Sequence, residues 1–188
     1  MATEHTQRFM EKHLALSGKP HCVTSKEAAA DIIAAVLAAT AARRVALANL
    51  SPELTSAIEQ KASALSIEVI KEPYPASSLP HSIDEAQVGV TGIAFGIAQT
   101  ATLAEVATND AQRLVSALPR IHIGVVYAED IVETLEDAAP LLRSIFEQFP
   151  ENCAVSFISG PSRTGDIELK LTLGVHGPGE QHAIIIED

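Results

Sequence analysis

Apolar residues recur along the chain in two spacings, which predict an alternation of strands and helices. Short continuous apolar runs, such as IHIGVVY at residues 121–127, are typical of strands buried in a parallel sheet. Strands are expected over residues 44–49, 66–71, 88–91, 101–106, 121–127, 154–159 and 183–187, with a short apolar piece at 21–23. Helical spacing is found over residues 3–17, 25–42, 52–65, 110–118 and 129–149. This alternation predicts an α/β fold with a mainly parallel, mixed sheet.

Polar residues mark where several of these helices begin. Thr24 and Glu27 have the spacing of a capping box, in which each satisfies a backbone N–H of the helix start. Ser51 stands directly before Pro52, the pair that favours an N-cap and a first helical position. Acidic residues at 129–133 favour a helix start there, because carboxylates are stabilised at the positive end of a helix.

Three further segments, at residues 92–98, 167–173 and 72–82, remain to be assigned a secondary structure. Residues 92–98 are expected to form a turn or a short helix. Residues 167–173 alternate as a strand would, but Thr164 and Asp166 resemble a helix start, and a short helix is preferred. The proline-containing loop at 72–82 is too short to separate two domains, so residues 1–188 are expected to form one domain on which the N-terminal helix packs.

Composition narrows the possible partners. The chain has 188 residues, of which 47% are hydrophobic and 4% aromatic, without tryptophan, so the core must consist of Ala, Leu, Ile and Val. Lys and Arg number 13 and Asp and Glu 24, a formal net charge of −11. An acidic surface repels phosphate backbones and anionic lipid, which argues against nucleic acid and membrane surfaces as partners. Without a long apolar run or a signal-peptide pattern, the expected location is the cytoplasm, with no membrane insertion.

Two cysteines, Cys22 and Cys153, are far apart in the sequence. An iron–sulfur cluster needs about four thiolates, so this chain is not expected to hold one alone. The seven histidines lack the H-x-x-x-H spacing of a metal site. His122 alternates with apolar residues in a predicted strand and is interpreted as structural. No cofactor and no metal are therefore expected in this chain.

The densest candidate site is the segment SGPSRTGDIE at 159–168, which follows a predicted strand. Its backbone N–H groups, hydroxyls and Arg163 can bind a carboxylate or phosphate. The alternative is a tight turn in which Arg163 pairs with Asp166 or Glu168. These two carboxylates are candidates for acid–base chemistry, and local helix capping is the simpler explanation of both.

Two further segments contribute candidates. The glycine-rich segment GVHGPG at 174–179 places His176 where it can act as an acid, a base or an anion partner; the alternative is a plain surface turn. Thr100 and Thr102 are expected to share one face of a strand and to line a pocket, unless strand propensity alone explains them. The residues predicted to bind a ligand are Thr100, Thr102, Ser159, Gly160, Ser162, Arg163, Thr164, His176 and Gly177; the catalytic candidates are Asp166, Glu168 and His176.

These segments together resemble the LutC, or LUD-domain, family of lactate-utilisation proteins. The matching residues are VTG at 90–92, IAQTAT at 97–102, RL at 113–114, LP at 118–119, IHIGVV at 121–126, SGPSRTGDIE at 159–168 and GVHGP at 174–178. The resemblance is specific over about residues 85–188 and general before that. The chain departs from the family at Gln99 and Ala101, where members often have Glu-Thr-Gly-Thr over 99–102.

The resemblance implies a three-layer α/β/α fold like that of the NagB, RpiA and CoA-transferase superfamily. It also implies a non-iron–sulfur subunit of a bacterial system that oxidises L-lactate to pyruvate. LutA-like and LutB-like iron–sulfur proteins would be its partners and would carry the clusters, and a small anionic metabolite such as lactate would be its ligand. Two alternatives stay open. One is a stand-alone isomerase or acyl/CoA-transferase-like enzyme acting on a phosphorylated or CoA-linked substrate; the other is a non-catalytic assembly module.

Overall fold

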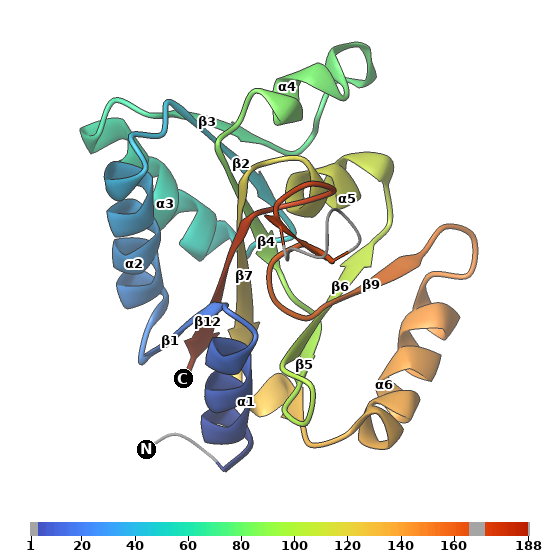
Figure 1. The fold of residues 1–188 in the computed structure, drawn as a ribbon. Helices are drawn as coiled ribbons and strands as arrows, with labels where there is room; N and C mark the ends of the chain where they lie inside the picture. Colours follow the sequence, from blue (N-terminus) through green and yellow to red (C-terminus); the bar gives the residue numbers. More distant parts are fainter. Residues whose placement is uncertain (1–3, 166–171, 188) are drawn as a thin grey trace.

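The central element of the fold is a six-stranded sheet whose neighbouring strands all run parallel (Figure 1). The computed structural model describes residues 4–165 and 172–187. The order of the strands across the sheet is β1 (Lys19–Val23), β12 (Glu180–Ile186), β7 (Ile121–Tyr127), β4 (Val88–Gly92), β2 (Arg44–Ala48) and β3 (Glu68–Lys71). The apolar runs of the sequence form its middle strands, which are buried on both faces.

One face of this sheet is covered by α2 (Lys26–Ala39) and α3 (Pro52–Ala64). The apolar side chains of both helices pack on alternate residues of the strands, including Val45, Val90 and Ile123. Alanine, leucine, isoleucine and valine make up this core cluster entirely, as the composition predicts.

The other face is covered by three kinds of element. They are α1 (Glu4–Ala15), the helices α4 (His81–Asp84) and α5 (Asp110–Ala117), and a second, four-stranded sheet. That sheet has the order β8 (Ile131–Val132), β5 (Phe95–Ile97), β6 (Thr102–Ala107) and β9 (Ala154–Ile158), and α6 (Leu135–Gln148) packs on its outer side. The hairpin of β10 (Arg163–Thr164) and β11 (Thr172–Leu173) and the short 3-10 turns Ala76–Ser78 and Ala128–Asp130 complete the described elements.

The first helix packs on its own chain. Phe9 is fully buried in a cluster that contains residues of both sheets, such as Leu103 and Ile185. His13, one turn further along the helix, stacks on Phe9 with ring centroids 5.6 Å apart. This arrangement confirms the prediction that the N-terminal helix packs within the chain.

The predicted α/β fold with a mainly parallel sheet is confirmed, and most predicted elements lie within two or three residues of the observed ones. Four local predictions are wrong. The N-cap of α2 is Ser25 and not Thr24, because the Ser25 hydroxyl accepts a hydrogen bond from the Ala28 backbone N–H at 3.1 Å. Glu27 still lies in the first turn of that helix.

Two of the others concern strands of the second sheet, and one concerns β11. Residues 92–98 contain strand β5, since Phe95, Gly96 and Ile97 pair with β6. The helix predicted from residue 129 begins at Leu135, because residues 131–132 pair with β5 and the Thr134–Asp137 capping box starts α6 only after them. Of the segment 167–173, the helix prediction is wrong for β11, and the rest lies outside the described residues.

Candidate functional site

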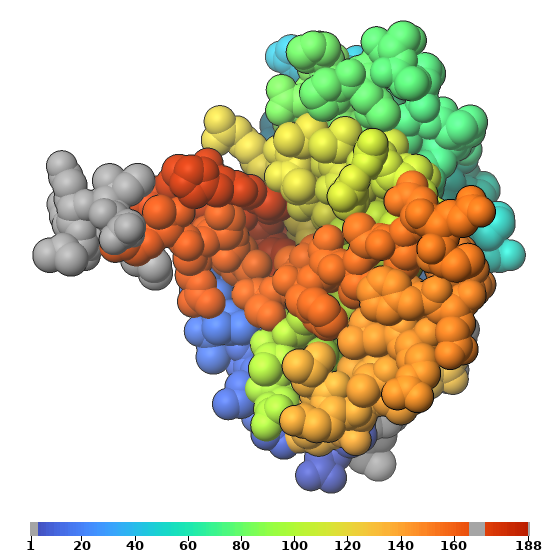
Figure 2. All heavy atoms as spheres, turned by 90° about the vertical axis from the view of Figure 1, so that its right-hand side faces the viewer, coloured from blue at the N-terminus to red at the C-terminus, as the bar shows by residue number. Residues whose placement is uncertain are grey.

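A cavity of about 390 Å³, lined by polar side chains as well as by apolar surface, opens between the two sheets, on the face shown in Figure 2. Its walls come from α5, from residues 156–162 and from residues 176–178, and its floor comes from the amino ends of β7 and β12. In Figure 2 the orange β9 segment, the red segment before β12 and the yellow-green α5 surround a hollow. We call this space the polar cavity.

The floor of the polar cavity consists of His122 and Gln181, which are neighbours across β7 and β12. Each is only 1% exposed. The His122 Nδ1 atom and both side-chain polar atoms of Gln181 have no hydrogen-bond partner among the described residues. Buried polar atoms are nearly always paired, so two adjacent unpaired groups at the bottom of a cavity indicate a place for a polar ligand or water.

Glu105 lies behind the floor and is fully buried. Its Oε2 accepts a hydrogen bond of 2.6 Å from the Ser116 hydroxyl, and Ser116 itself lines the cavity. Burial raises the pKa of the Glu105 carboxyl to about 7, although the Ser116 and Thr91 hydroxyls act in the opposite direction. Burial is also the main reason that the pKa of His122 falls to about 3, so this imidazole is neutral at ordinary pH.

Arg113 supplies a positive charge to the wall of the cavity. Its side chain is half exposed and pairs with Asp110, three residues earlier on the same helix. An exposed pair of this kind contributes little to stability, so the guanidinium can turn to an anionic ligand at small cost. Together with the hydroxyls of Ser159 and Ser162, it gives the cavity donors for a carboxylate.

Five of the predicted ligand-binding residues line the polar cavity: Ser159, Gly160, Ser162, His176 and Gly177. The two loops that carry them are joined by backbone bonds, because the Ser162 N–H donates to the Pro178 carbonyl at 2.9 Å and the Gly174 N–H donates to the Ser162 carbonyl at 3.0 Å. His176 and Gly177 also line a second hollow of about 630 Å³ next to α4 and α5. The loop therefore separates two cavities.

The other predicted residues lie outside the lining. Thr102 reaches the cavity only indirectly, through a 2.7 Å bond to the Ser159 hydroxyl, and Thr100 bonds to Thr102 at 2.7 Å. Arg163 and Thr164 form β10 and pair with β11 instead. Asp166 and Glu168, the carboxylate candidates, lie outside the described residues.

Sequence reasoning missed Arg113, Ser116 and Gln181, and it interpreted His122 as structural. Arg113 enters the sequence analysis only as part of the matching motif RL at 113–114, without a role, and Ser116 does not enter it. Gln181 precedes the expected start of the last strand. His122 was the one available signal, because a polar side chain on the buried face of an apolar strand requires either a partner or a function.

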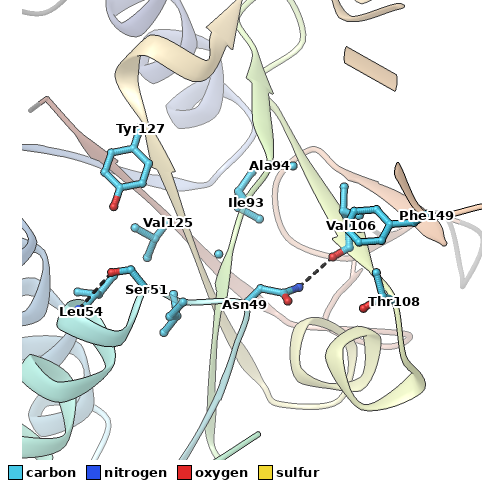
Figure 3. A pocket seen from close by; sticks show the side chains of 12 residues that line it. Asn49, Ser51, Leu54, Ile93, Ala94, Val106, Thr108, Val125, Tyr127 and Phe149 are labelled. Atoms are coloured by element: carbon cyan, nitrogen blue, oxygen red, sulfur yellow. Dashed lines mark hydrogen bonds between the residues drawn. The ribbon is translucent and has the colours of Figure 1, made fainter. Parts of the chain in front are cut away.

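A third cavity, of about 310 Å³, lies at the carboxyl ends of β2, β4 and β7 (Figure 3). Ligands of open α/β sheets often bind at this edge. Its lining is mostly apolar, with Tyr127 and Phe149 on opposite sides. The Asn49 side chain donates to the Val106 carbonyl at 2.9 Å, and the Ser51 hydroxyl accepts from Leu54. Because these polar groups are already bonded, we regard the polar cavity as the candidate site.

In residues 4–165 and 172–187, no three His, Cys, Asp or Glu side chains lie close enough together to hold a metal ion. Both cysteines are free thiols. No helix in the same part of the chain has the length and apolar character needed to cross a membrane.

Comparison with known proteins places the chain in a family. The model of the LUD domain matches residues 6–186. Lactate utilization protein C of Shouchella clausii is 34% identical over 57% of this chain and 48% of its own length. The protein of the same name from Bacillus subtilis is 32% identical over 56% of this chain and 44% of its own. The chain thus spans about half the length of these curated relatives.

The fold is also found in a solved structure. A crystal structure of a DUF162 family protein from Deinococcus radiodurans superimposes with a TM-score of 0.68 over 97% of this chain and 96% of that one, at 22% sequence identity. The likeness supports the arrangement of strands and helices described above. With the match of the family model over nearly the whole chain, the conclusion is that this protein belongs to the LUD domain family.

Proposed function

We propose that the chain is a subunit without iron–sulfur clusters in a system that oxidises L-lactate to pyruvate, and that its polar cavity binds a small carboxylate. The observation that carries the proposal is the composition of that cavity: one cation, Arg113, several hydroxyls, and the unpaired floor groups of His122 and Gln181. A 2-hydroxy acid presents a charge and a hydroxyl, which match the cation and the floor.

The curated relatives support the choice of pathway, since their names are those of lactate utilisation proteins. Two cysteines do not suffice for a cluster, so electron transfer requires partners. We propose LutA-like and LutB-like iron–sulfur proteins for that role, in the cytoplasm. Gentle co-purification from cells grown on lactate, followed by mass spectrometry, tests this: recovery of such proteins in near-equal amounts is expected, and their absence even after mild chemical cross-linking would contradict it.

Titration of the purified chain with L-lactate tests the carboxylate site directly. Arg113→Ala should weaken binding about tenfold or more, because a hydrogen bond to a charged group contributes about 1.5–3 kcal/mol. Calorimetry or changes in amide NMR signals can measure the affinity. Arg143→Ala, which removes an exposed cation on α6, is the matched control and should leave the affinity unchanged.

A second variant, Arg163→Ala, tells whether the carboxylate binds in the polar cavity or at the β10–β11 hairpin. If Arg163→Ala abolishes binding while Arg113→Ala does not, the carboxylate binds at the β10–β11 hairpin and the polar cavity is not the site. If the native chain binds neither lactate nor another small carboxylate, the proposed function is wrong.

A further inference from the structure

Strand β9 is an edge of the four-stranded sheet, and within the described residues it pairs with β6 alone. Hydrogen bonds of β6 to other parts of the chain show how its backbone alternates. The Ala104 carbonyl accepts from the Ala94 N–H at 2.9 Å, and the Val106 carbonyl accepts from the Asn49 side chain at 2.9 Å. Even-numbered residues of β6 therefore direct their backbone groups away from β9, and odd-numbered residues direct theirs toward it.

The register of the two strands carries this alternation over to β9. Glu105 lies opposite Ser156, so Ser156 and Ile158 make the hydrogen bonds of the ladder. Val155 and Phe157 consequently point their N–H and C=O groups away from the sheet. In the part of the chain that the structure describes, no backbone bond to β9 is found besides the β6 ladder. The edge thus offers two donors and two acceptors to a further strand.

This edge lacks the features that usually keep strand edges apart, which are charges, prolines and bulges. The sequence of β9, AVSFI at 154–158, has no charged residue and no proline, and its register with β6 is continuous. The Phe157 ring meets Phe95 edge-on, with centroids 6.4 Å apart, and is still 48% exposed. A strand that covers this edge must therefore be uncharged, and it must be apolar on the face of Phe157.

We propose that β9 pairs with β9 of a second copy of this chain, antiparallel and about a two-fold axis at Ser156. In this register Val155 of each copy lies opposite Phe157 of the other, and both pairs exchange two N–H···O bonds. All the outward backbone groups of the two residues are then bonded. Val155 and Phe157 share a face of the strand, so each aromatic ring packs on a valine of the other copy. An identical strand supplies this pattern without further requirements, and two-fold pairing is the commonest form of assembly.

The same pairing brings the candidate sites of the two copies together. Ser156 lines the polar cavity, and its side chain lies on the face of β9 opposite to that of Phe157. At the two-fold axis Ser156 of one copy faces Ser156 of the other, with Cα atoms about 4.5 Å apart. The second copy therefore adds a hydroxyl beside the lining of each polar cavity.

The charge of the chain affects this association in a measurable way. Each copy has a formal net charge of −11, so two copies repel one another at a distance. Salt at about 0.1 M screens charges that are more than about 10 Å apart, and the paired strands themselves are uncharged. The dimer should accordingly become tighter as the salt concentration rises, whereas an interface made of ion pairs would become weaker.

Analytical ultracentrifugation of the full chain between about 1 and 100 μM tests the pairing. We expect a species of twice the 19.9 kDa mass of the chain. Phe157→Lys places a charge on the edge and should weaken the dimer about tenfold or more. Phe146→Lys is the matched control, because Phe146 is 50% exposed but lies on α6, and it should dimerise as the native chain does.

Hydrogen exchange identifies the edge without any substitution. The Val155 and Phe157 amides should exchange slowly in a concentrated solution of the native chain and rapidly in a dilute one. A native chain that stays monomeric at about 100 μM overturns the inference. So does a dimer that Phe157→Lys forms as well as the native chain, or one in which these two amides stay unprotected. None of these measurements involves lactate, so a failure here is distinct from a failure of the proposed function.

Discussion

Glu105 makes the stability of the chain depend on pH. Its carboxyl has a folded-state pKa of about 7 against an ordinary value of 4.5, so the folded state retains the proton that the unfolded state loses. The contribution of Glu105 to the stability of the fold is therefore fully present below about pH 4.5, and it is lost as the pH rises through about 7. The shift corresponds to about 3 kcal/mol. The glutamine side chain in the variant Glu105→Gln cannot ionise. As the pH rises from about 5 to about 8, the free energy of unfolding of this variant, relative to that of the native chain, should therefore increase by about that amount.

Denaturant unfolding at the two pH values measures this difference in the free energy of unfolding.

The buried histidines give the opposite pH dependence. Burial lowers the pKa of His13 to about 4 and that of His122 to about 3. Both histidines therefore destabilise the fold as the pH falls below about 6.5. They are present in the native chain and in the variant, so their effect cancels in the comparison. A difference that is the same at both pH values would mean that Glu105 ionises normally.

At the scale of elements, the helix α5, which forms a wall of the polar cavity, packs closely on strand β4 at Gly89. A Cβ atom on Gly89 would lie 2.0 Å from the Val115 carbonyl oxygen of α5. Backbone cannot move aside as a flexible side chain does, so Gly89→Ala must displace the helix that carries Arg113 and Ser116. We expect a loss of about 1–3 kcal/mol in the free energy of unfolding, together with weaker lactate binding.

Gly165→Ala is the matched control, because no atom of the described residues lies within 4 Å of a Cβ atom at that position. It should change neither thermal stability nor affinity by a measurable amount. If Gly89→Ala binds lactate as well as the control does, the position of α5 is not important for the site.

The sequence predicts elements better than it predicts the site, for a physical reason. The strand IHIGVVY is apolar over its whole length and was placed at the observed residues 121–127. Strands β5 and β8 were missed because two or three residues carry little periodicity and depend on their pairing with each other. The loops at 159–162 and 176–178 were found from their glycines and hydroxyls. Gln181 and Ser116 join them only through the tertiary fold, which no local pattern encodes.

At the scale of the whole molecule, Phe9 joins both sheets through one core cluster. Removing a buried Phe side chain typically costs about 3–5 kcal/mol. In Phe9→Ala we therefore expect both sheets to lose stability together, in one cooperative transition seen equally by circular dichroism and by hydrogen exchange. This result would support the prediction that residues 1–188 form a single domain.

Phe146 provides the comparison, since its side chain on α6 is 50% exposed. Phe146→Ala should cost less than about 1 kcal/mol. Separate unfolding of the two sheets in Phe9→Ala, with the six-stranded sheet still protected from exchange, would show two units instead of one.

The two ends of β7 lead to different cavities. His122 lies near its amino end, in the floor of the polar cavity, and Tyr127 lies at its carboxyl end, in the wall of the apolar one. Four residues of extended chain lie between them, and the five steps from one to the other span roughly 17 Å. Both cavities can therefore be occupied at the same time. A protein bound at the carboxyl ends of the strands would leave the polar cavity at their amino ends open to small molecules.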